Sequence, residues 1–370
     1  MKLEDEVSIG KSRTPGRPLS CFLRLSILLL KAIGSCATPT FCERRGAALA
    51  GLVLTGVFHF TPVAAADLPV FALTVYAPPS YSSWLPALIK KQGFDIRYGF
   101  TLKVSHKVGT VAYLDTALGN DYACGCISPI TFSQFVAQGA KVSMIFNIWL
   151  GTSLVAVADP AIRNASDLQG RILGVDRDSA QWAVTAFILE QAGLDLTKVK
   201  FRSAYGTSQV AEFAAGRVDA FFPALTEVAS LQTRTKEYHI ISVFDQSAWQ
   251  IYSHSRAIPS ITLGVSRSWV RDPSHLDLVR RLYAAYRDAA DYARQNPEDA
   301  ADTIFAATKM EKAAVKYVLA HFPEALSVEP ISNYKGAIKV LTQELLVRGK
   351  QLGRPMTDEE VNAYVSDFSP

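Results

Sequence analysis

The sequence predicts an α/β protein made of two lobes, and three observations lead to this fold class. From residue 67 onward, short apolar segments typical of strands alternate with amphipathic segments typical of helices. The stretch 67–370 is longer than one hydrophobic core usually serves, so we expect two lobes. No heptad, low-complexity stretch or short-period repeat accounts for the alternation. We therefore expect sheets covered by helices.

Residues 44–66 have the three parts of a secretory signal peptide. Arg44-Arg45 begins the segment, an apolar run covers 47–58, and Ala64-Ala65-Ala66 supplies a small-residue cleavage site. The apolar run is shorter than the roughly 20 residues that cross a bilayer. We expect cleavage after Ala66 and a soluble periplasmic protein that begins at Asp67. An uncleaved membrane anchor is the alternative.

Residues 1–43 precede this signal and carry a weaker apolar patch at 21–30. Signal peptides usually begin close to their basic residues. We therefore expect translation to start nearer Arg44, so that much of 1–43 results from a mis-called start; a genuine extension is the alternative. The pair Arg44-Arg45 leaves both the general and the twin-arginine export routes open.

The net positive charge of the chain comes from residues 1–66, which include the expected signal peptide. The full sequence has 38 Lys/Arg and 34 Asp/Glu, of which residues 1–66 hold 8 and 4, so 67–370 keeps 30 of each. A neutral surface gives no electrostatic reason to bind nucleic acid. We expect no nucleic-acid partner, and a monomer.

Only Cys124 and Cys126 follow the expected cleavage site. On a strand, residues i and i+2 point to the same face, but a bond between them would be strained. We therefore expect two buried, small apolar side chains rather than a disulfide. The six histidines show no metal-ligand spacing, so we expect no metal and no cofactor.

The first group of elements covers 68–158. Pro78-Pro79 ends the first strand, Gly93 and Gly119 close two helices, and Ser128-Pro129 opens a third. The expected strands are 68–76, 100–106, 122–127, 142–149 and 153–158, and the expected helices are 84–92, 111–118 and 128–138.

A second group begins at Asn164, and a mostly helical region follows it. Gly193 and Gly216 close two of its helices, and the strand 261–266 returns to the first group. The other expected strands are 171–175, 199–203, 218–222 and 240–244. The expected helices are 179–192, 207–215, 275–295, 297–307, 311–321, 332–348 and 358–365.

Two helix starts are candidates for binding an anion. Ser128-Pro129 follows a strand of the first group, and the motif Asp178-Ser179-Ala180-Gln181 follows a strand of the second. The free N–H groups and the positive dipole end of a capped helix suit an anion. Ligands of open α/β sheets bind at the carboxyl ends of strands, so the pair could hold a small anion between the lobes. Ordinary capped helices are the alternative.

Aromatic side chains gather near the predicted strand ends, where they could line a ligand pocket or simply pack in the core. They are Tyr76, Tyr81, Trp84, Tyr205, Phe222 and Trp249. Glu227 follows this region and could contact an amine of the ligand. A solvated position on a helix is the more common place for a glutamate.

Catalytic motifs are absent. The sequence has no G-x-S-x-G, H-E-x-x-H, Walker or G-x-G-x-x-G motif. We therefore expect no catalytic residues and no enzyme.

The order of several motifs resembles the nitrate/sulfonate/taurine-type substrate-binding proteins of ABC transporters. The first lobe of that family is similar to GNDYA at 119–123, Ser128-Pro129 and QGAKV at 138–142. Its second lobe is similar to DLQGRILGV at 167–175 and AAGRVDA at 214–220. The resemblance covers nearly all of 67–370.

The resemblance implies a type II periplasmic-binding fold, with two crossovers that we place near Ala158 and Pro259. Lobe 1 would then cover 67–158 and 259–370, and lobe 2 would cover 159–258. The family binds its substrate between the lobes, and hinge closure traps it. The implied partners are a small organic anion, such as a sulfonate or taurine, and an ABC permease in the inner membrane.

Two departures from the family leave the ligand open. FFPAL at 221–225 replaces a Trp-rich run, and Cys124-Gly125-Cys126 is unusual before Ser128-Pro129. Alkyl sulfonates, taurine, a pyrimidine and an aromatic acid remain candidates, and nitrate fits the aromatics least. Two other functions stay open: a thiamine-pyrimidine binding or synthesis protein, which would use the cysteines, and a sensor module.

Overall fold

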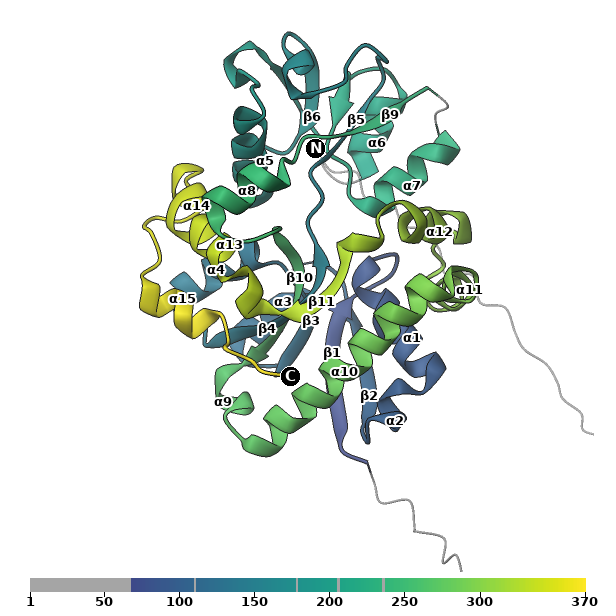
Figure 1. Cartoon of the computed structure of the whole chain (residues 1–370), viewed down its shortest axis with the longest axis vertical. Helices are drawn as coiled ribbons and strands as arrows, with labels where there is room; N and C mark the ends of the chain where they lie inside the picture. The colour runs from purple at the N-terminus through teal and green to yellow at the C-terminus, as the bar shows by residue number, and fades with distance from the viewer. Residues whose placement is uncertain (1–67, 110, 178, 205–206, 235–236) are drawn as a thin grey trace, which may run out of the picture. The chain divides into compact units, whose positions relative to one another are not determined.

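The computed structural model describes residues 68–109, 111–177, 179–204, 207–234 and 237–370 (Figure 1). The expected signal peptide and its cleavage site lie outside these residues. The described chain forms two sheets with helices packed on them, which confirms the α/β class. Among the described helices, none has both the length and the apolar character needed to cross a membrane.

The first sheet has the strand order β11-β4-β10-β3-β1-β2. Strand β1 is parallel to β2 and β3, whereas β10 is antiparallel to β3 and β4. The carboxyl ends of β1, β2 and β3 therefore lie at one edge, which is where open sheets bind ligands. The strands are β1 (Val70–Tyr76), β2 (Thr101–Lys107), β3 (Ala123–Ile127), β4 (Val142–Leu150), β10 (Pro259–Ser266) and β11 (Leu326–Pro330).

The second sheet has the order β7-β6-β8-β5-β9. Strand β6 is parallel to β7 and β8, and β5 is antiparallel to β8 and β9. Its strands are β5 (Leu154–Val157), β6 (Ile172–Val175), β7 (Lys200–Ser203), β8 (Ala220–Phe221) and β9 (His239–Ser242).

The two crossovers between the sheets lie side by side. The second enters β10 at Pro259, where it was expected. The first lies between Leu150 and Leu154, so the prediction near Ala158 was wrong. Strand β5 pairs with β8 and β9, and this pairing assigns it to the second lobe. The backbone N–H of Gly151 donates to the carbonyl of Ile258 over 2.8 Å and joins the crossovers.

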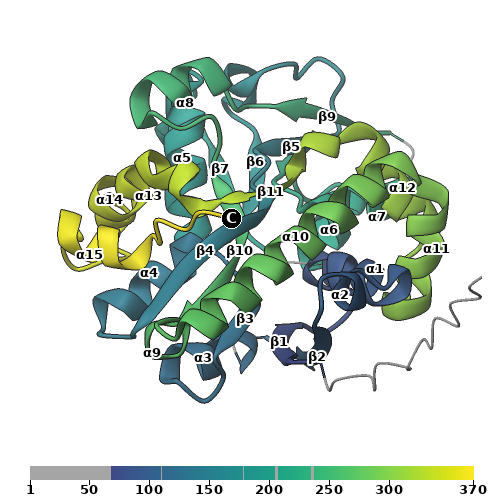
Figure 2. The same cartoon turned by 60° about the horizontal axis from the view of Figure 1, so that its bottom comes forward.

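Two large hydrophobic clusters lie on the two faces of the first sheet. Figure 2 shows the helices that cover these faces. One includes Phe71, Phe146 and Tyr286 with helices α1 (Trp84–Gln92), α10 (Pro273–Gln295), α11 (Pro297–Thr308) and α12 (Lys312–His321). The other joins α4 (Pro129–Ala137), α13 (Lys335–Val340), α14 (Leu346–Arg348) and α15 (Asp358–Tyr364) to α5 (Ala180–Gln191). The remaining α-helices are α2 (Phe94–Arg97), α3 (Val111–Leu118), α6 (Thr207–Ala214), α7 (Leu225–Arg234), α8 (Gln246–Ser253) and α9 (Arg267–Val270).

The C-terminal region departs most from the sequence prediction. The single helix expected over 332–348 is divided into a 3₁₀ turn, α13, a π-helical turn (Leu341–Leu345) and α14. Strand β11, which no pattern indicated, pairs with β4. The C-terminal region also contacts the second lobe, because α12 packs on α7 and Arg348 of α14 pairs with Glu190 of α5 at 2.6 Å.

Candidate functional site

Both predicted helix starts are capped by serine. Ser128 precedes α4, and its Oγ accepts from the backbone N–H of Ile130 over 3.3 Å. Ser179 precedes α5, and its Oγ accepts from the N–H of Trp182 over 3.1 Å. One cap follows β3 of the first sheet and the other follows β6 of the second. Each lobe therefore carries a helix start with the dipole and free N–H groups that suit an anion.

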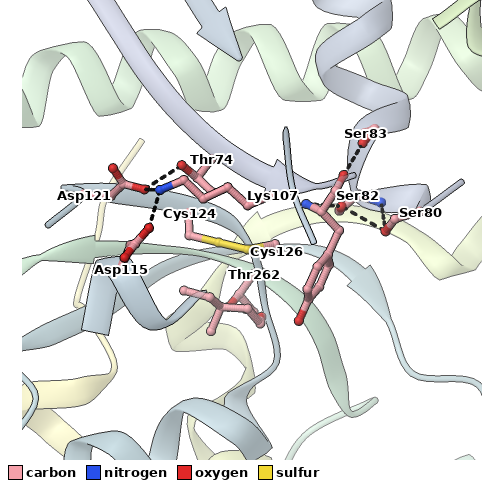
Figure 3. Close-up of a disulfide and its surroundings, with 12 residues drawn as sticks. Thr74, Ser80, Ser82, Ser83, Lys107, Asp115, Asp121, Cys124, Cys126 and Thr262 are labelled. Atoms are coloured by element: carbon pink, nitrogen blue, oxygen red, sulfur yellow. Dashed lines mark hydrogen bonds and ion pairs between the residues drawn. A yellow bond between two sulfur atoms is a disulfide. The ribbon is translucent and has the colours of Figure 1, made fainter. Parts of the chain in front are cut away.

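The loop after β1 is held by serine hydroxyls (Figure 3). The N–H of Tyr76 donates to Ser82 Oγ over 3.2 Å, and Ser83 Oγ donates to the carbonyl of Tyr76 over 2.8 Å. The Tyr76 ring meets the Tyr113 ring of α3 edge to face, with centroids 6.4 Å apart. Tyr113 was not among the predicted residues, although it lies in the first turn of the helix that follows β2.

Tyr81 and Trp84 meet at Trp149 near the carboxyl end of β4. Their ring centroids lie 5.2 Å and 5.4 Å from that of Trp149, both edge to face. Trp84 and Trp149 are each 1% exposed, and within the described chain neither indole N–H has a hydrogen-bond partner. Trp149 was missed, although a tryptophan at a strand end fits the criterion that selected the other aromatics.

Glu227 lies in the first turn of α7 and is half-buried. Its neighbours Leu225 and Val228 pack in the same hydrophobic cluster as Trp84 and Trp149. Burial raises the pKa of the Glu227 carboxyl, and the backbone N–H of Ala224 partly offsets this by donating to Oε2 over 2.9 Å. Glu227 is therefore a helix residue that is only partly solvated.

Side chains of both lobes influence the pKa of Tyr81. Burial raises the pKa of the Tyr81 phenol, a hydrogen bond with the Ser260 side chain lowers it, and the charge of Glu227 raises it. Tyr81 precedes α1 in lobe 1, Ser260 lies at the start of β10, and Glu227 belongs to lobe 2. The pKa of Tyr81 thus depends on side chains that are distant from it in sequence, and sequence reasoning missed Ser260.

The remaining predicted residues of lobe 2 lie in two groups. Phe222 meets the ring of Trp182 with centroids 6.3 Å apart, and Trp182 in turn meets Phe201. Gln181 is exposed in the first turn of α5, next to Trp182. Asp178 and Tyr205 lie outside the described residues.

Trp249 lies in a separate group between α5 and α8. It is 4% exposed and packs against Phe187 of α5 and Phe244, and with them it lines a small pocket. Its indole N–H has no partner among the described residues. The structure thus accounts for Trp249 as a packing residue of lobe 2, and its contact with a ligand stays a prediction.

The structure joins Cys124 and Cys126 in a disulfide (Figure 3), so the expectation of two unlinked cysteines was wrong. Their burial is confirmed, with 0% and 2% exposed. The pairing of β3 with β10 shifts register here: between the pairs Thr262–Ile127 and Gly264–Cys124, two residues of β3 lie opposite one residue of β10. Their Cα atoms are 5.4 Å apart, against about 6.6 Å in a regular strand, which is within disulfide range.

Lys107, at the carboxyl end of β2, is neutralised within its own lobe (Figure 3). Its Nζ lies 2.5 Å from Asp115 and 2.6 Å from Asp121, and Thr74 donates to Asp121 over 2.8 Å. The lysine lowers the pKa of Asp115, and the two carboxylates raise the pKa of Lys107. Because this charge is already balanced, the N-termini of α4 and α5 are the better candidates for an anion.

A larger groove of about 720 Å³ lies elsewhere, between α1, β2 and α11. Its lining includes Lys90, His106 and Asp302, and none of the predicted ligand residues. This groove therefore does not coincide with the residues that the sequence predicts to bind the ligand.

The sequence profile of the NMT1/THI5-like family matches residues 90–300. The chain belongs to this family. This membership and the structural likeness below agree with the predicted kinship to nitrate/sulfonate/taurine-type binding proteins of ABC transporters.

A curated relative from Brucella abortus (strain 2308), named only as a binding protein, is 23% identical over 192 residues. That match spans 51% of this chain and 56% of the relative, so the chain spans little more than half the length of that relative.

The similar solved structures include two sulfonate-binding proteins. The periplasmic aliphatic sulphonate binding protein SsuA of Escherichia coli gives a TM-score of 0.66 at 14% identity, over 81% of this chain and 92% of that one. The alkanesulfonate-binding SsuA of Xanthomonas axonopodis pv. citri, bound to MOPS, gives 0.58 at 16%, over 78% and 95%. The desulfurization enzyme DSZB gives 0.54 at 19%, over 80% and 96%. Identities this low show the fold, which is the two-lobed periplasmic-binding fold.

Proposed function

We propose that this protein is the extracytoplasmic substrate-binding component of an ABC importer. It binds a small organic anion, of the sulfonate or taurine type, between its two lobes and delivers it to a permease in the inner membrane. It acts in the periplasm as a monomer, after loss of the signal peptide, and it catalyses no reaction.

One observation carries the proposal: each lobe presents a serine-capped helix start after a parallel strand. Ser128 caps α4 after β3, and Ser179 caps α5 after β6. Two positive helix ends, one from each lobe, favour the state in which an anion bridges them. Hinge motion at the paired crossovers of Gly151 and Ile258 would close the lobes on the ligand.

The enzyme alternative relied on free cysteines. Cys124 and Cys126 are buried and joined, so neither offers a thiolate, which is the reactive form of cysteine. The fold shared with DSZB gives no residue-level support, because identity is only 19%.

A thermal-shift screen tests the proposal. The expected mature protein, 67–370, is heated with sulfonates, taurine, nitrate, carboxylates and thiamine precursors. A ligand at 100 times its dissociation constant adds about 2.7 kcal/mol to the free energy of unfolding. We expect a shift with one anionic class; no shift with any of them would contradict the proposal.

Cap variants then locate the anion. Ser128→Gly and Ser179→Gly keep the helix start at a cost of a few tenths of a kcal/mol, whereas alanine costs about 1 kcal/mol. If the serine hydroxyl contacts the anion, both the glycine and the alanine variants lose affinity. If the helix end alone holds the anion, the glycine variants keep their affinity for the anion.

A further inference from the structure

An arginine on the second crossover is bound by the first lobe. Arg256 lies between the end of α8 at Ser253 and the start of β10 at Pro259. Its Nη2 donates to Ser327 Oγ over 3.0 Å and forms an ion pair with Glu329 Oε1. Both acceptors belong to β11, so a side chain of the crossover is held by an edge strand of the first sheet.

The Glu329 carboxylate accepts from further donors of lobe 1. Ser327 Oγ donates to its Oε1 over 3.0 Å, and Asn333 Nδ2 and Tyr334 Oη each donate to its Oε2 over 3.2 Å. The Tyr334 hydroxyl also accepts from Arg256 over 3.1 Å. An isolated surface ion pair adds little to stability, whereas a network that fixes both charges adds more. The guanidinium is therefore held by several bonds and not by one surface pair.

The sheet order places this network at the end where the lobes are connected. Strand β4 lies between β10 and β11. Leu150, from which the first crossover leaves β4, pairs with Pro259 of β10, and Trp149 pairs with Leu326 of β11. Arg256 therefore links the strands on both sides of β4 at the point where the chain passes between the lobes.

The residue before Arg256 is attached to lobe 1 as well. Ser255 is 3% exposed, and its Oγ accepts from the backbone N–H of Ala337 in α13 over 3.0 Å. Two consecutive residues of the second crossover are thus bonded to the first lobe before β10 begins.

We propose that Arg256 is a positioning residue of the hinge: by joining the second crossover to Glu329 of β11, it restrains how far the two lobes open. Rotation of lobe 2 away from lobe 1 bends both crossovers, and the guanidinium network resists the bending of one of them. Arg256 does this without contacting the ligand. Its loss populates more open arrangements and lowers the apparent affinity, because only the fraction that closes holds the ligand. The effect on affinity rests on the proposed binding function, whereas the restraint can be tested without a ligand.

Hydrogen exchange at the backbone N–H of Gly151 is the first test, on ligand-free protein purified after export. This N–H donates to the carbonyl of Ile258 over 2.8 Å, so its protection reports whether the crossovers stay together. We expect exchange there to become about tenfold faster in Arg256→Gln and in Glu329→Gln. The double variant should be no faster than either single variant, because both lose the same ion pair. Arg256→Lys keeps the charge and should restore part of the protection.

Arg354→Gln is the matched control. Arg354 forms a partly exposed, bidentate ion pair with Glu360 at 2.8 Å and 2.7 Å, and its hydrogen bonds within the described chain stay in 354–360. Its loss should leave exchange at Gly151 unchanged.

Scattering and calorimetry then measure the consequence for the lobes. Ligand-free Arg256→Gln should have a larger radius of gyration than the unmodified protein, and it should bind ethanesulfonate, the probe, about tenfold more weakly.

The outcomes separate the restraint from the binding function. Unchanged exchange at Gly151 in both single variants would overturn the restraint, and so would an equal acceleration at amides throughout the core, which reports general destabilisation. Faster exchange confined to the crossovers, with no ligand found in the thermal-shift screen, would support the restraint and contradict the binding function.

Discussion

The surroundings of two single residues, Glu227 and Gly125, lead to predictions about the free energy of unfolding. The folded-state pKa of Glu227 is raised, so folding favours its protonated form. The contribution of Glu227 to the free energy of unfolding is therefore fully present at acid pH, and it is lost as the pH rises through the pKa of Glu227 in the folded protein. Glu227→Gln resembles the protonated form. We therefore expect it to raise the free energy of unfolding of the ligand-free protein at neutral pH.

Denaturant unfolding at two pH values checks this prediction. The gain should shrink when the pH falls below about 4.3, the ordinary pKa of glutamate, because the native carboxyl is then neutral as well. A gain of the same size at both pH values would show that packing, and not charge, is responsible.

Gly125 leaves little room for a side chain. A Cβ atom there would lie 3.1 Å from the Tyr286 hydroxyl and 3.4 Å from Leu73 Cδ1. We expect Gly125→Ala to destabilise the protein by about 1–3 kcal/mol, the usual cost of overpacking a core. Gly353→Ala, where a Cβ atom meets nothing within 4 Å, is the control in the same denaturation assay.

At the scale of elements, the disulfide in β3 should have a local effect. It closes a loop of only three residues, so the entropy model gives about 1.6 kcal/mol of stabilisation at most. We expect the double variant Cys124→Ala and Cys126→Ala to fold, with a loss of that order in the free energy of unfolding. A loss of 4 kcal/mol or more, roughly the value for a 100-residue loop, would contradict this view.

Helices with a clear start could be predicted from the sequence pattern, whereas a short strand such as β11 could not. The cap at Ser128, the start at Pro129 and the helix of 129–137 follow from local chemistry, and the structure confirms them. The strand β11 has only five residues and ends at Pro330, so its pattern is weak. It exists because β4 offers it an edge to pair with. The register shift opposite Cys124 likewise depends on β10, which is distant in sequence.

At the scale of the whole molecule, two glycines let the C-terminal region approach the second lobe. A Cβ atom on Gly336 of α13 would lie 1.9 Å from the carbonyl oxygen of Ser253, at the end of α8. A Cβ atom on Gly349 would lie 2.4 Å from the Cβ of Ala183 in α5. Both contacts join segments of different lobes.

We expect Gly336→Ala to be the more damaging of the two substitutions. Its clash is with backbone, which cannot rotate away, so it should cost about 3 kcal/mol, the upper part of the overpacking range. If these contacts also set the separation of the lobes, small-angle scattering should show an expanded ligand-free protein. An unchanged stability and radius of gyration would disprove the close approach.

The sequence by itself determined the fold class, the serine caps and most strand and helix positions. These depend on periodicity and on residues within one turn, so they can be seen in a single chain. The tertiary structure decided which lobe holds β5, the link between Cys124 and Cys126, and the packing of Tyr81 and Trp84 against Trp149. Each of these depends on partners far along the chain. The burial that raises the pKa of Glu227 likewise exists only when the two lobes are packed together.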